Sequence, residues 1–108
     1  MVLLAGIYYP EGYSMLPKEC IAAVFSEVGK PLEMRQFKLP HELEPGAALC
    51  KVKMSTICGS DLHTISGRRT EPAPLILGHE TIGEIVALGS DLETDGFGDK
   101  LEIGGRVS

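Results

Sequence analysis

Short apolar runs that end at proline or glycine fill the chain from Cys20 onward, and this feature limits the possible folds most strongly. The runs 21–25, 32–38, 81–88 and 101–107 each have the length of a strand, and turn-forming residues separate them. Several short strands with little helix between them predict a mainly β fold, in the form of a small barrel or sandwich.

One segment connects this pattern to a site. Residues 48–57 alternate between apolar and polar side chains, which predicts a half-buried strand with Cys50, Val52 and Met54 on its buried face. The strand is followed by residues 59–66, which have the composition of one or two helical turns. Ser60 is the expected cap of that helix, and the glycine after Ser66 is its stop signal.

Composition excludes several classes of partner. The 108 residues suffice for one globular domain, and a net charge of −5 with a single Arg68-Arg69 pair argues against a nucleic-acid surface. No apolar run is long enough to span a bilayer, so we expect no membrane segment. Three cysteines without close spacing form no disulfide framework, which favours the reducing cytoplasm.

The first 19 residues differ from the rest of the chain. They begin with an apolar run that Pro10 interrupts, and they lack the basic segment of a signal peptide. Met15 is an alternative start to Met1. We expect residues 1–19 to be a poorly ordered extension and residues 20–108 to be the domain. Because the last predicted strand runs up to the chain end, we also expect a longer, truncated protein.

Two motifs offer the ligands of a metal site. The first is Cys58-Gly59-Ser60-Asp61-Leu62-His63 and the second is Gly78-His79-Glu80. A catalytic zinc takes three protein ligands and keeps one position open, and Cys58 and His79 are two good candidates. No third ligand is evident. The alternatives are a buried, inert cysteine and a histidine that is hydrogen-bonded elsewhere.

The residues between the two ligands suggest further roles, each with a simpler alternative. Asp61 can accept the free ring N–H of His79, or it can merely favour the helix dipole. Ser60 can hydrogen-bond a zinc-bound alcohol, or it can cap the helix. His63 can pass a proton to solvent because its ordinary pKa is near neutrality, or it can be an exposed helix residue.

The two motifs together resemble a known family. Cys-Gly-Ser-Asp-x-His followed by Gly-His-Glu-x-x-Gly-x-Ile-Val-x-x-Gly is similar to the medium-chain, zinc-dependent alcohol dehydrogenases. The resemblance runs from about Ala22 to Val107 and covers the first part of their N-terminal, GroES-like catalytic domain. It implies a partly open antiparallel β-barrel with short helices. A weaker likeness is to a subgroup proposed to act in phosphonate catabolism, and it rests on the run Cys-Gly-Ser-Asp-Leu-His-Thr-Ile-Ser-Gly-Arg-Arg and on the segment 89–104.

The resemblance also implies roles for individual residues. Cys58 and His79 would be ligands of the catalytic zinc, and Glu80 would be an alternate ligand or a carboxylate close to the metal. Ser60 and His63 would belong to a proton relay, and Asp61 would orient His79. The family's Gly-Asp-Arg-Val is replaced here by Gly104-Gly105-Arg106-Val107, which removes an aspartate outside the zinc site.

The implied activity belongs to the full-length enzyme. It would oxidise a small alcohol to an aldehyde or ketone by hydride transfer to NAD or NADP, and it would form a homo-oligomer. This chain contains no Gly-x-Gly-x-x-Gly fingerprint and shows no third ligand, so we expect it to be inactive alone. The alternatives are a polyol or sugar dehydrogenase, a non-catalytic GroES-like module, and a related barrel that binds no metal.

Overall fold

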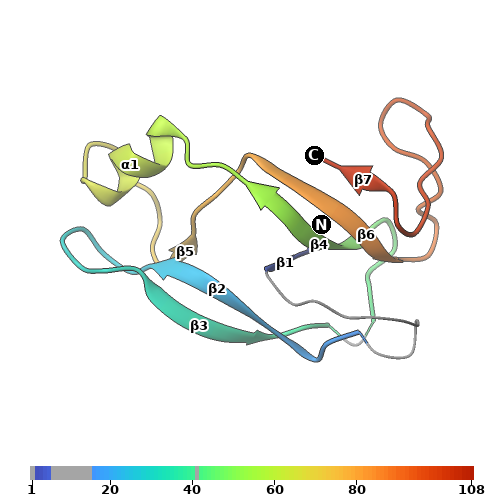
Figure 1. The fold of residues 1–108 in the computed structure, drawn as a ribbon, viewed down its shortest axis with the longest axis horizontal. Helices are drawn as coiled ribbons and strands as arrows, with labels where there is room; N and C mark the ends of the chain where they lie inside the picture. The colour runs from blue at the N-terminus through green and yellow to red at the C-terminus, as the bar shows by residue number, and fades with distance from the viewer. Residues whose placement is uncertain (1, 6–15, 41) are drawn as a thin grey trace.

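The strands form two open sheets (Figure 1). The computed structural model describes residues 2–5, 16–40 and 42–108. The larger sheet has the strand order β1-β4-β6-β7, and the smaller sheet has the order β3-β2-β5. The elements are β1 (Val2–Ala5), β2 (Glu19–Phe25), β3 (Glu33–Lys38), β4 (Ala48–Ser55), α1 (Gly59–Ile65), β5 (Leu75–Ile76), β6 (Thr81–Leu88) and β7 (Arg106–Val107). The predicted mainly β fold class is therefore confirmed.

The first strand adds a parallel edge to an otherwise antiparallel arrangement. Val2–Ala5 pairs parallel with β4, whereas the β4–β6, β6–β7, β2–β3 and β2–β5 pairs are antiparallel. The prediction of a poorly ordered extension over residues 1–19 stays a prediction, because residues 1 and 6–15 lie outside the described part of the chain.

The last predicted strand is wrong over most of its length. Within residues 101–107 only Arg106–Val107 form a strand. A turn precedes it, because the Gly105 N–H donates to the Glu102 carbonyl oxygen at 2.9 Å. The two-residue strand β5 was not predicted, since it is too short to produce a periodic pattern.

The buried face of β4 also differs from the prediction. Leu49 and Cys50 are both buried although they are neighbours in sequence, and Met54 is 62% exposed. The pairing of β4 with β6 shifts between Leu49 and Cys50 and again between Val52 and Met54. Each irregularity interrupts the strict alternation of the pleat, so a strand with two of them cannot keep one face buried throughout.

The core lies between the two sheets. Cys20 on β2 packs with Leu49 on β4 and with Leu39 from the segment that joins the sheets. At the edge of this core, the N–H of Gly89 donates to the carbonyl oxygen of Ala47 at 2.7 Å. A Cβ at Gly89 would overlap the carbonyl oxygen of Glu44. Only glycine therefore lets the end of β6 approach the start of β4 this closely.

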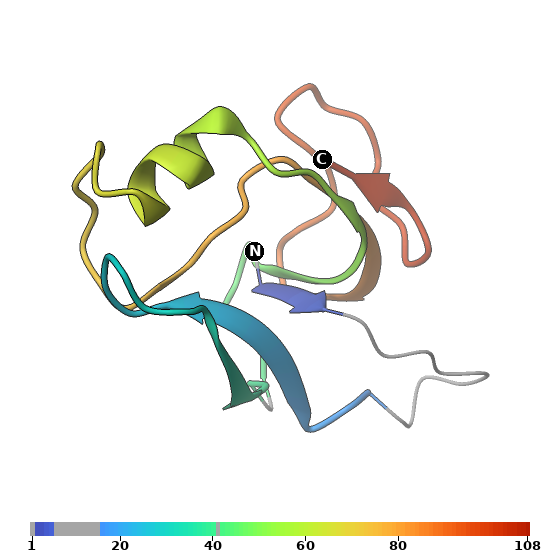
Figure 2. The same cartoon turned by 60° about the vertical axis from the view of Figure 1, so that its left-hand side comes forward.

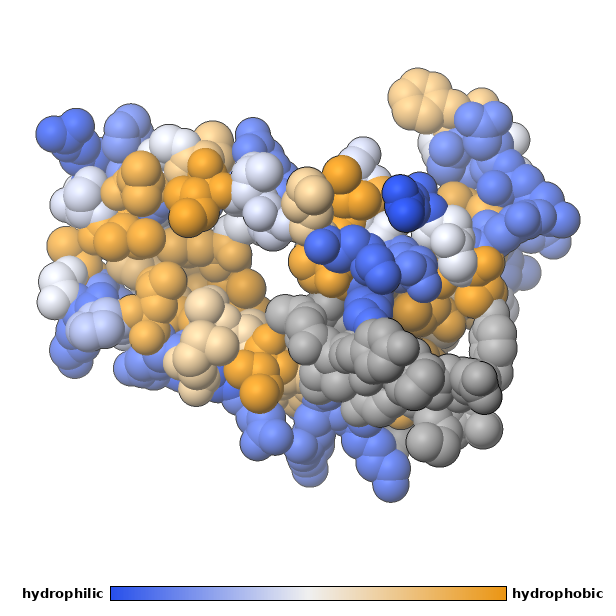
Figure 3. All heavy atoms as spheres, in the orientation of Figure 1, coloured by the Kyte–Doolittle hydropathy of each residue, from blue (hydrophilic) through white to orange (hydrophobic). Residues whose placement is uncertain are grey.

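Strands β4 and β6 lie between two projecting segments. Figure 2 shows α1 on one side of the molecule and the 89–105 loop on the other. Figure 3 shows apolar side chains gathered over the end that carries α1, β5 and part of β2. Large exposed apolar residues near this end include Ile57, Leu62 and Ile76.

No helix in the described part of the chain is long and apolar enough to cross a membrane.

Candidate metal centre

The pairing of β4 with β6 brings the two motifs together. Ser55, the last residue of β4, pairs with Thr81, the first residue of β6. One step further, the Thr56 N–H donates to the Glu80 carbonyl oxygen at 3.1 Å. Cys58 follows Ser55 by three residues and His79 precedes Thr81 by two, so the ladder places both side chains just beyond its end.

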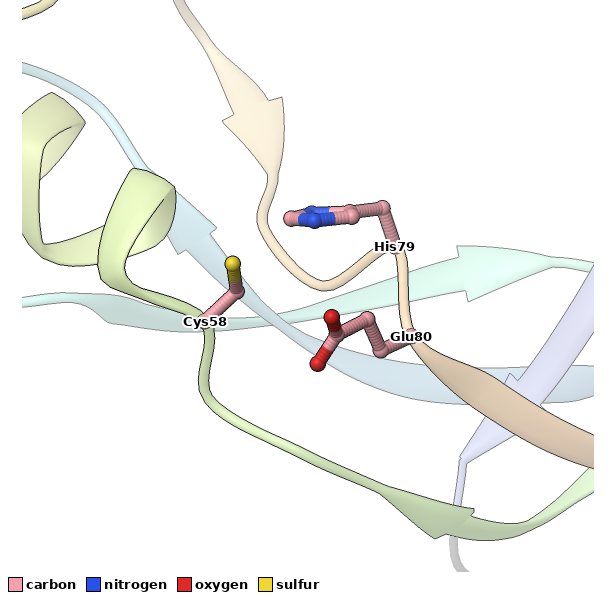
Figure 4. Close-up of side chains that lie close together, drawn as sticks. All are labelled: Cys58, His79 and Glu80. Atoms are coloured by element: carbon pink, nitrogen blue, oxygen red, sulfur yellow. The ribbon is translucent and has the colours of Figure 1, made fainter.

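Three side chains with ligand atoms converge there. A sulfur of Cys58, a ring nitrogen of His79 and a carboxylate oxygen of Glu80 all lie within 4.8 Å of one another. In Figure 4 the three side chains point toward a common space between the start of α1 and the turn before β6. Cys58 is half-buried, and His79 and Glu80 are exposed. One sulfur, one nitrogen and one oxygen donor form a set that suits zinc.

A glycine sets the backbone direction at the histidine. Gly78 has a φ of +112°, in the region that side-chain-bearing residues rarely adopt. Among the described residues, only the Ser55 hydroxyl lies within 4 Å of an ideal Cβ at this position, at 3.5 Å. The glycine is therefore required by the backbone conformation rather than by crowding. It turns the chain from β5 into β6 so that His79 meets Cys58.

Thr56 holds the carboxylate of Glu80. Its hydroxyl donates to Oε2 of Glu80 at 2.5 Å, which leaves the other carboxylate oxygen for an ion. The sequence analysis missed this residue. The residue types alone carried no signal for it, because the register that places Thr56 beside Glu80 is set by the pairing of β4 with β6.

The surroundings of Cys58 favour the thiolate form of its side chain. Hydrogen bonds from the Ser60 side chain and backbone, followed by one from His79, lower the pKa of Cys58 below its ordinary value. Partial burial and the nearby charge of Glu80 oppose this shift but do not cancel it. Since the thiolate is the form that binds metals, these neighbours favour the ligand state.

Asp61 connects the helix start to the histidine. The carboxylate is buried, with 7% exposure. Its Oδ2 accepts the backbone N–H of Cys58 at 3.0 Å, and its Oδ1 lies 3.6 Å from Nδ1 of His79. The second distance is longer than a hydrogen bond, although it places the two groups as neighbours. The role of Asp61 in orienting His79 stays a prediction.

The helix begins at Gly59 as predicted, but its N-cap stands two residues earlier than expected. Cys58, rather than Ser60, is the N-cap, with extended backbone angles of φ −90° and ψ 155°. The reason is that Asp61 stands three residues later and bonds back to the Cys58 N–H, as in a capping box. Ser60 is instead inside α1, where its backbone oxygen accepts from the Thr64 hydroxyl. The Ser60 side chain hydrogen-bonds the Cys58 thiol.

His63 is not one of the three converged side chains. It is exposed and three residues after Ser60, a spacing that puts two side chains on one helix face. Within the described residues, no hydrogen bond is recorded between the His63 ring and the Ser60 hydroxyl. The proton relay therefore stays a prediction.

A pocket of about 280 Å³ opens beside the ligands. Its walls come from α1, from the loop after α1 and from the segment that contains β5, and they include Ser60, Asp61, Thr64, Arg69, Glu71, Leu75, Ile76, Leu77, Gly78 and His79. The volume is close to the lower end of small-molecule sites. Arg69 and Glu71 were not among the predicted site residues.

Comparisons with known proteins identify relatives of this chain. The Thermotoga maritima alcohol dehydrogenase crystal structure superposes with a TM-score of 0.72 at 29% identity, over 82% of this chain and 24% of that one. Alcohol dehydrogenase 2 of Caenorhabditis elegans is 39% identical over 90 residues, which cover 82% of this chain and 25% of that protein. The 5-exo-hydroxycamphor dehydrogenase of Pseudomonas putida is 45% identical over 64 residues, 58% of this chain and 18% of that protein.

These matches also define the extent of the similarity. The chain spans about a quarter of the length of the C. elegans protein and less of the P. putida protein. The predicted GroES-like fold is confirmed by the structural match. The family model described as the alcohol dehydrogenase GroES-like domain matches residues 44–108, more than half of the chain. The chain belongs to the alcohol dehydrogenase GroES-like domain family.

Proposed function

We propose that this chain supplies the zinc-binding part of an oxidoreductase that converts an alcohol into an aldehyde or ketone. The observation that carries the proposal is the convergence of Cys58, His79 and Glu80 at the end of the β4–β6 ladder. Relatives named as alcohol, hydroxycamphor and formaldehyde dehydrogenases support the reaction class.

The residues fit a zinc ion. Cys58, His79 and Glu80 would hold it, with a thiolate favoured by its hydrogen bonds and a carboxylate already held by Thr56. A bound zinc supplies Lewis acidity, which lowers the pKa of an alcohol that coordinates it. The exposure of His79 and Glu80 leaves the site accessible from the pocket.

Other residues of the chain would handle the proton. Ser60 lines the pocket and contacts Cys58, so its hydroxyl can accept the substrate proton. His63, one helical turn further and exposed, would release that proton to solvent. Asp61, buried between the Cys58 backbone and the His79 ring, would fix the ring's orientation.

The remaining parts of the proposal concern the whole protein. It would transfer hydride to NAD or NADP, act on a small alcohol, form a homo-oligomer and work in the cytoplasm. This chain contains no Gly-x-Gly-x-x-Gly sequence, which supports inactivity of the chain by itself.

Metal titration tests the proposal directly. We expect the chain to bind one zinc by calorimetry, and cobalt in its place to show thiolate-to-metal absorption. Removing a ligand should weaken binding, so Cys58→Ser should abolish that absorption and His79→Ala should lower the zinc affinity by at least about tenfold. His63→Ala is the matched control, because it removes another exposed histidine. Equal zinc affinities for the two histidine variants would contradict the proposed ligand set.

A further inference from the structure

The pocket beside the metal ligands contains an arginine whose role the proposed function leaves open. Arg69 and Glu71 both line the pocket, in a wall otherwise formed by α1 and residues 75–79. The Nε of Arg69 pairs with Oε1 of Glu71 at 2.5 Å. The backbone N–H of Arg69 donates to the His63 carbonyl oxygen at 3.1 Å, which ties this loop to the end of α1.

The two carboxylates of the pocket already have partners. Asp61 accepts the Cys58 N–H with one oxygen and faces the His79 ring with the other. Glu71 pairs with Arg69. The acidic groups of the pocket are therefore engaged by the protein itself, and they do not by themselves define a site for a cation.

Arg69 has hydrogen-bonding capacity left over. A guanidinium carries five N–H donors in a planar fork, and the recorded contact with Glu71 uses the Nε edge. In the described part of the chain, Glu71 is the acceptor recorded for the Arg69 side chain. Arg69 is 55% exposed, so its remaining donors are accessible to a ligand at the mouth of the pocket. Such a fork matches a carboxylate or a phosphate group.

We propose that Arg69 binds an anionic group of the substrate, so that the preferred substrate is a small alcohol carrying a carboxylate or a phosphate. Glu71 would act as a positioning residue that fixes the guanidinium. The hydroxyl of such a molecule would face His79 and Ser60, which line the same pocket, while its anionic group would contact Arg69. The alcohol part of this inference rests on the proposed function, whereas the anion site depends only on the pocket.

Amide chemical shifts of the metal-free 108-residue chain provide the test. Propanoate and inorganic phosphate are titrated separately at a fixed ionic strength of about 0.1 M, with neutral 1-propanol as the reference ligand. We expect at least one anion to shift the amides of residues 60–79 and the Arg69 Nε–H signal saturably. Arg69→Gln should weaken that anion's binding by about tenfold or more, because a charge-assisted hydrogen bond is lost.

The chain offers a matched control in Arg68. It is exposed and adjacent in sequence, yet it does not line the pocket, so Arg68→Gln removes the same charge and should change the affinity less than about twofold. Comparing the two anions identifies which group is preferred. Absence of saturable shifts with either anion, or equal losses in the Arg68 and Arg69 variants, would overturn the proposal.

The anion-binding result can be separated from the test of zinc binding. Zinc binding is measured on the same preparations. Normal zinc affinity without anion binding would remove the substrate inference and leave the proposed function intact. Anion binding that depends on Arg69, in a chain that binds no zinc, would keep the anion site and remove the proposed function together with the alcohol part of the inference.

Discussion

Replacing Gly78 by alanine should separate backbone strain from crowding at the metal site. The φ of +112° at this position is unfavourable for alanine, and strain of this kind costs about 1–3 kcal/mol. Steric overlap adds little, because the nearest atom to a new Cβ is the Ser55 hydroxyl at 3.5 Å. The expected penalty is therefore about 1–3 kcal/mol from the backbone alone.

This energetic cost can appear either as a lower free energy of unfolding or as weaker zinc binding. If the backbone keeps its conformation, the free energy of unfolding falls by that amount, which lowers the thermal midpoint by roughly 4–8 °C per kcal/mol in a domain of this size. If the backbone relaxes, His79 moves and zinc binding weakens, by about 5- to 150-fold if the whole penalty is expressed there. Urea unfolding and zinc calorimetry on the same variant measure both losses, and their sum should be about 1–3 kcal/mol.

Gly59→Ala is the control for this experiment. Gly59 stands next to the other proposed ligand, Cys58, but its φ is not positive, and in the described part of the chain an added Cβ would meet no atom within 4 Å. It lies inside α1, where alanine is the better helix former, so stability should stay the same or rise slightly. A Gly78→Ala variant that matches wild type in both stability and zinc affinity would refute the assignment of Gly78 to a strained turn.

Three further experiments test other parts of the structure. Thr56→Val should lower zinc affinity by about tenfold in calorimetry, because the carboxylate of Glu80 loses the hydrogen bond that holds it; an unchanged affinity would show that this bond is irrelevant to the ion. Gly89→Ala should cost about 1–3 kcal/mol in urea unfolding because its Cβ meets backbone oxygens, whereas Gly96→Ala, with open space around it, should be neutral. Cys58 should alkylate faster than the two buried cysteines near neutral pH, since its lowered pKa leaves more thiolate there and burial raises theirs; mass spectrometry after brief iodoacetamide treatment measures this order, and equal rates would contradict it.

Sequence patterns located the strands well where the pleat is regular. The predicted strand 81–88 has the observed bounds, because its β-branched residues lie between turn-forming residues. On β4 the prediction fails at Met54, since two shifts of register change which side chains face the core. Such shifts arise from the pairing partner, and the alternation within one strand does not contain them.

The candidate site shows the same limit. Cys58 and His79 carry a recognisable chemical signature, so they were found from their types and their order. The partners of Glu80 and Asp61 depend on the strand register and the turn at Gly78, which place residues about twenty positions apart side by side. Arg69 ends the run that carries the weaker subgroup likeness, but the sequence assigned it no role, because its place in a pocket depends on how the loop after α1 folds against residues 75–79.

The segment between Cys58 and His79 has a consequence for local motion. Cys58 and His79 are 21 residues apart, and α1, the loop with Arg69 and β5 all lie between them. An ion that joins the two ends would close this segment into a ring and raise the free energy of its local opening. Hydrogen exchange of the amides in α1 and β5 should then slow with zinc, while the amides of β3, which pairs with β2 on the side away from β5, should exchange as before. The ion would stabilise the segment 58–79 locally, and the stability of the rest of the fold would continue to depend on its hydrophobic core.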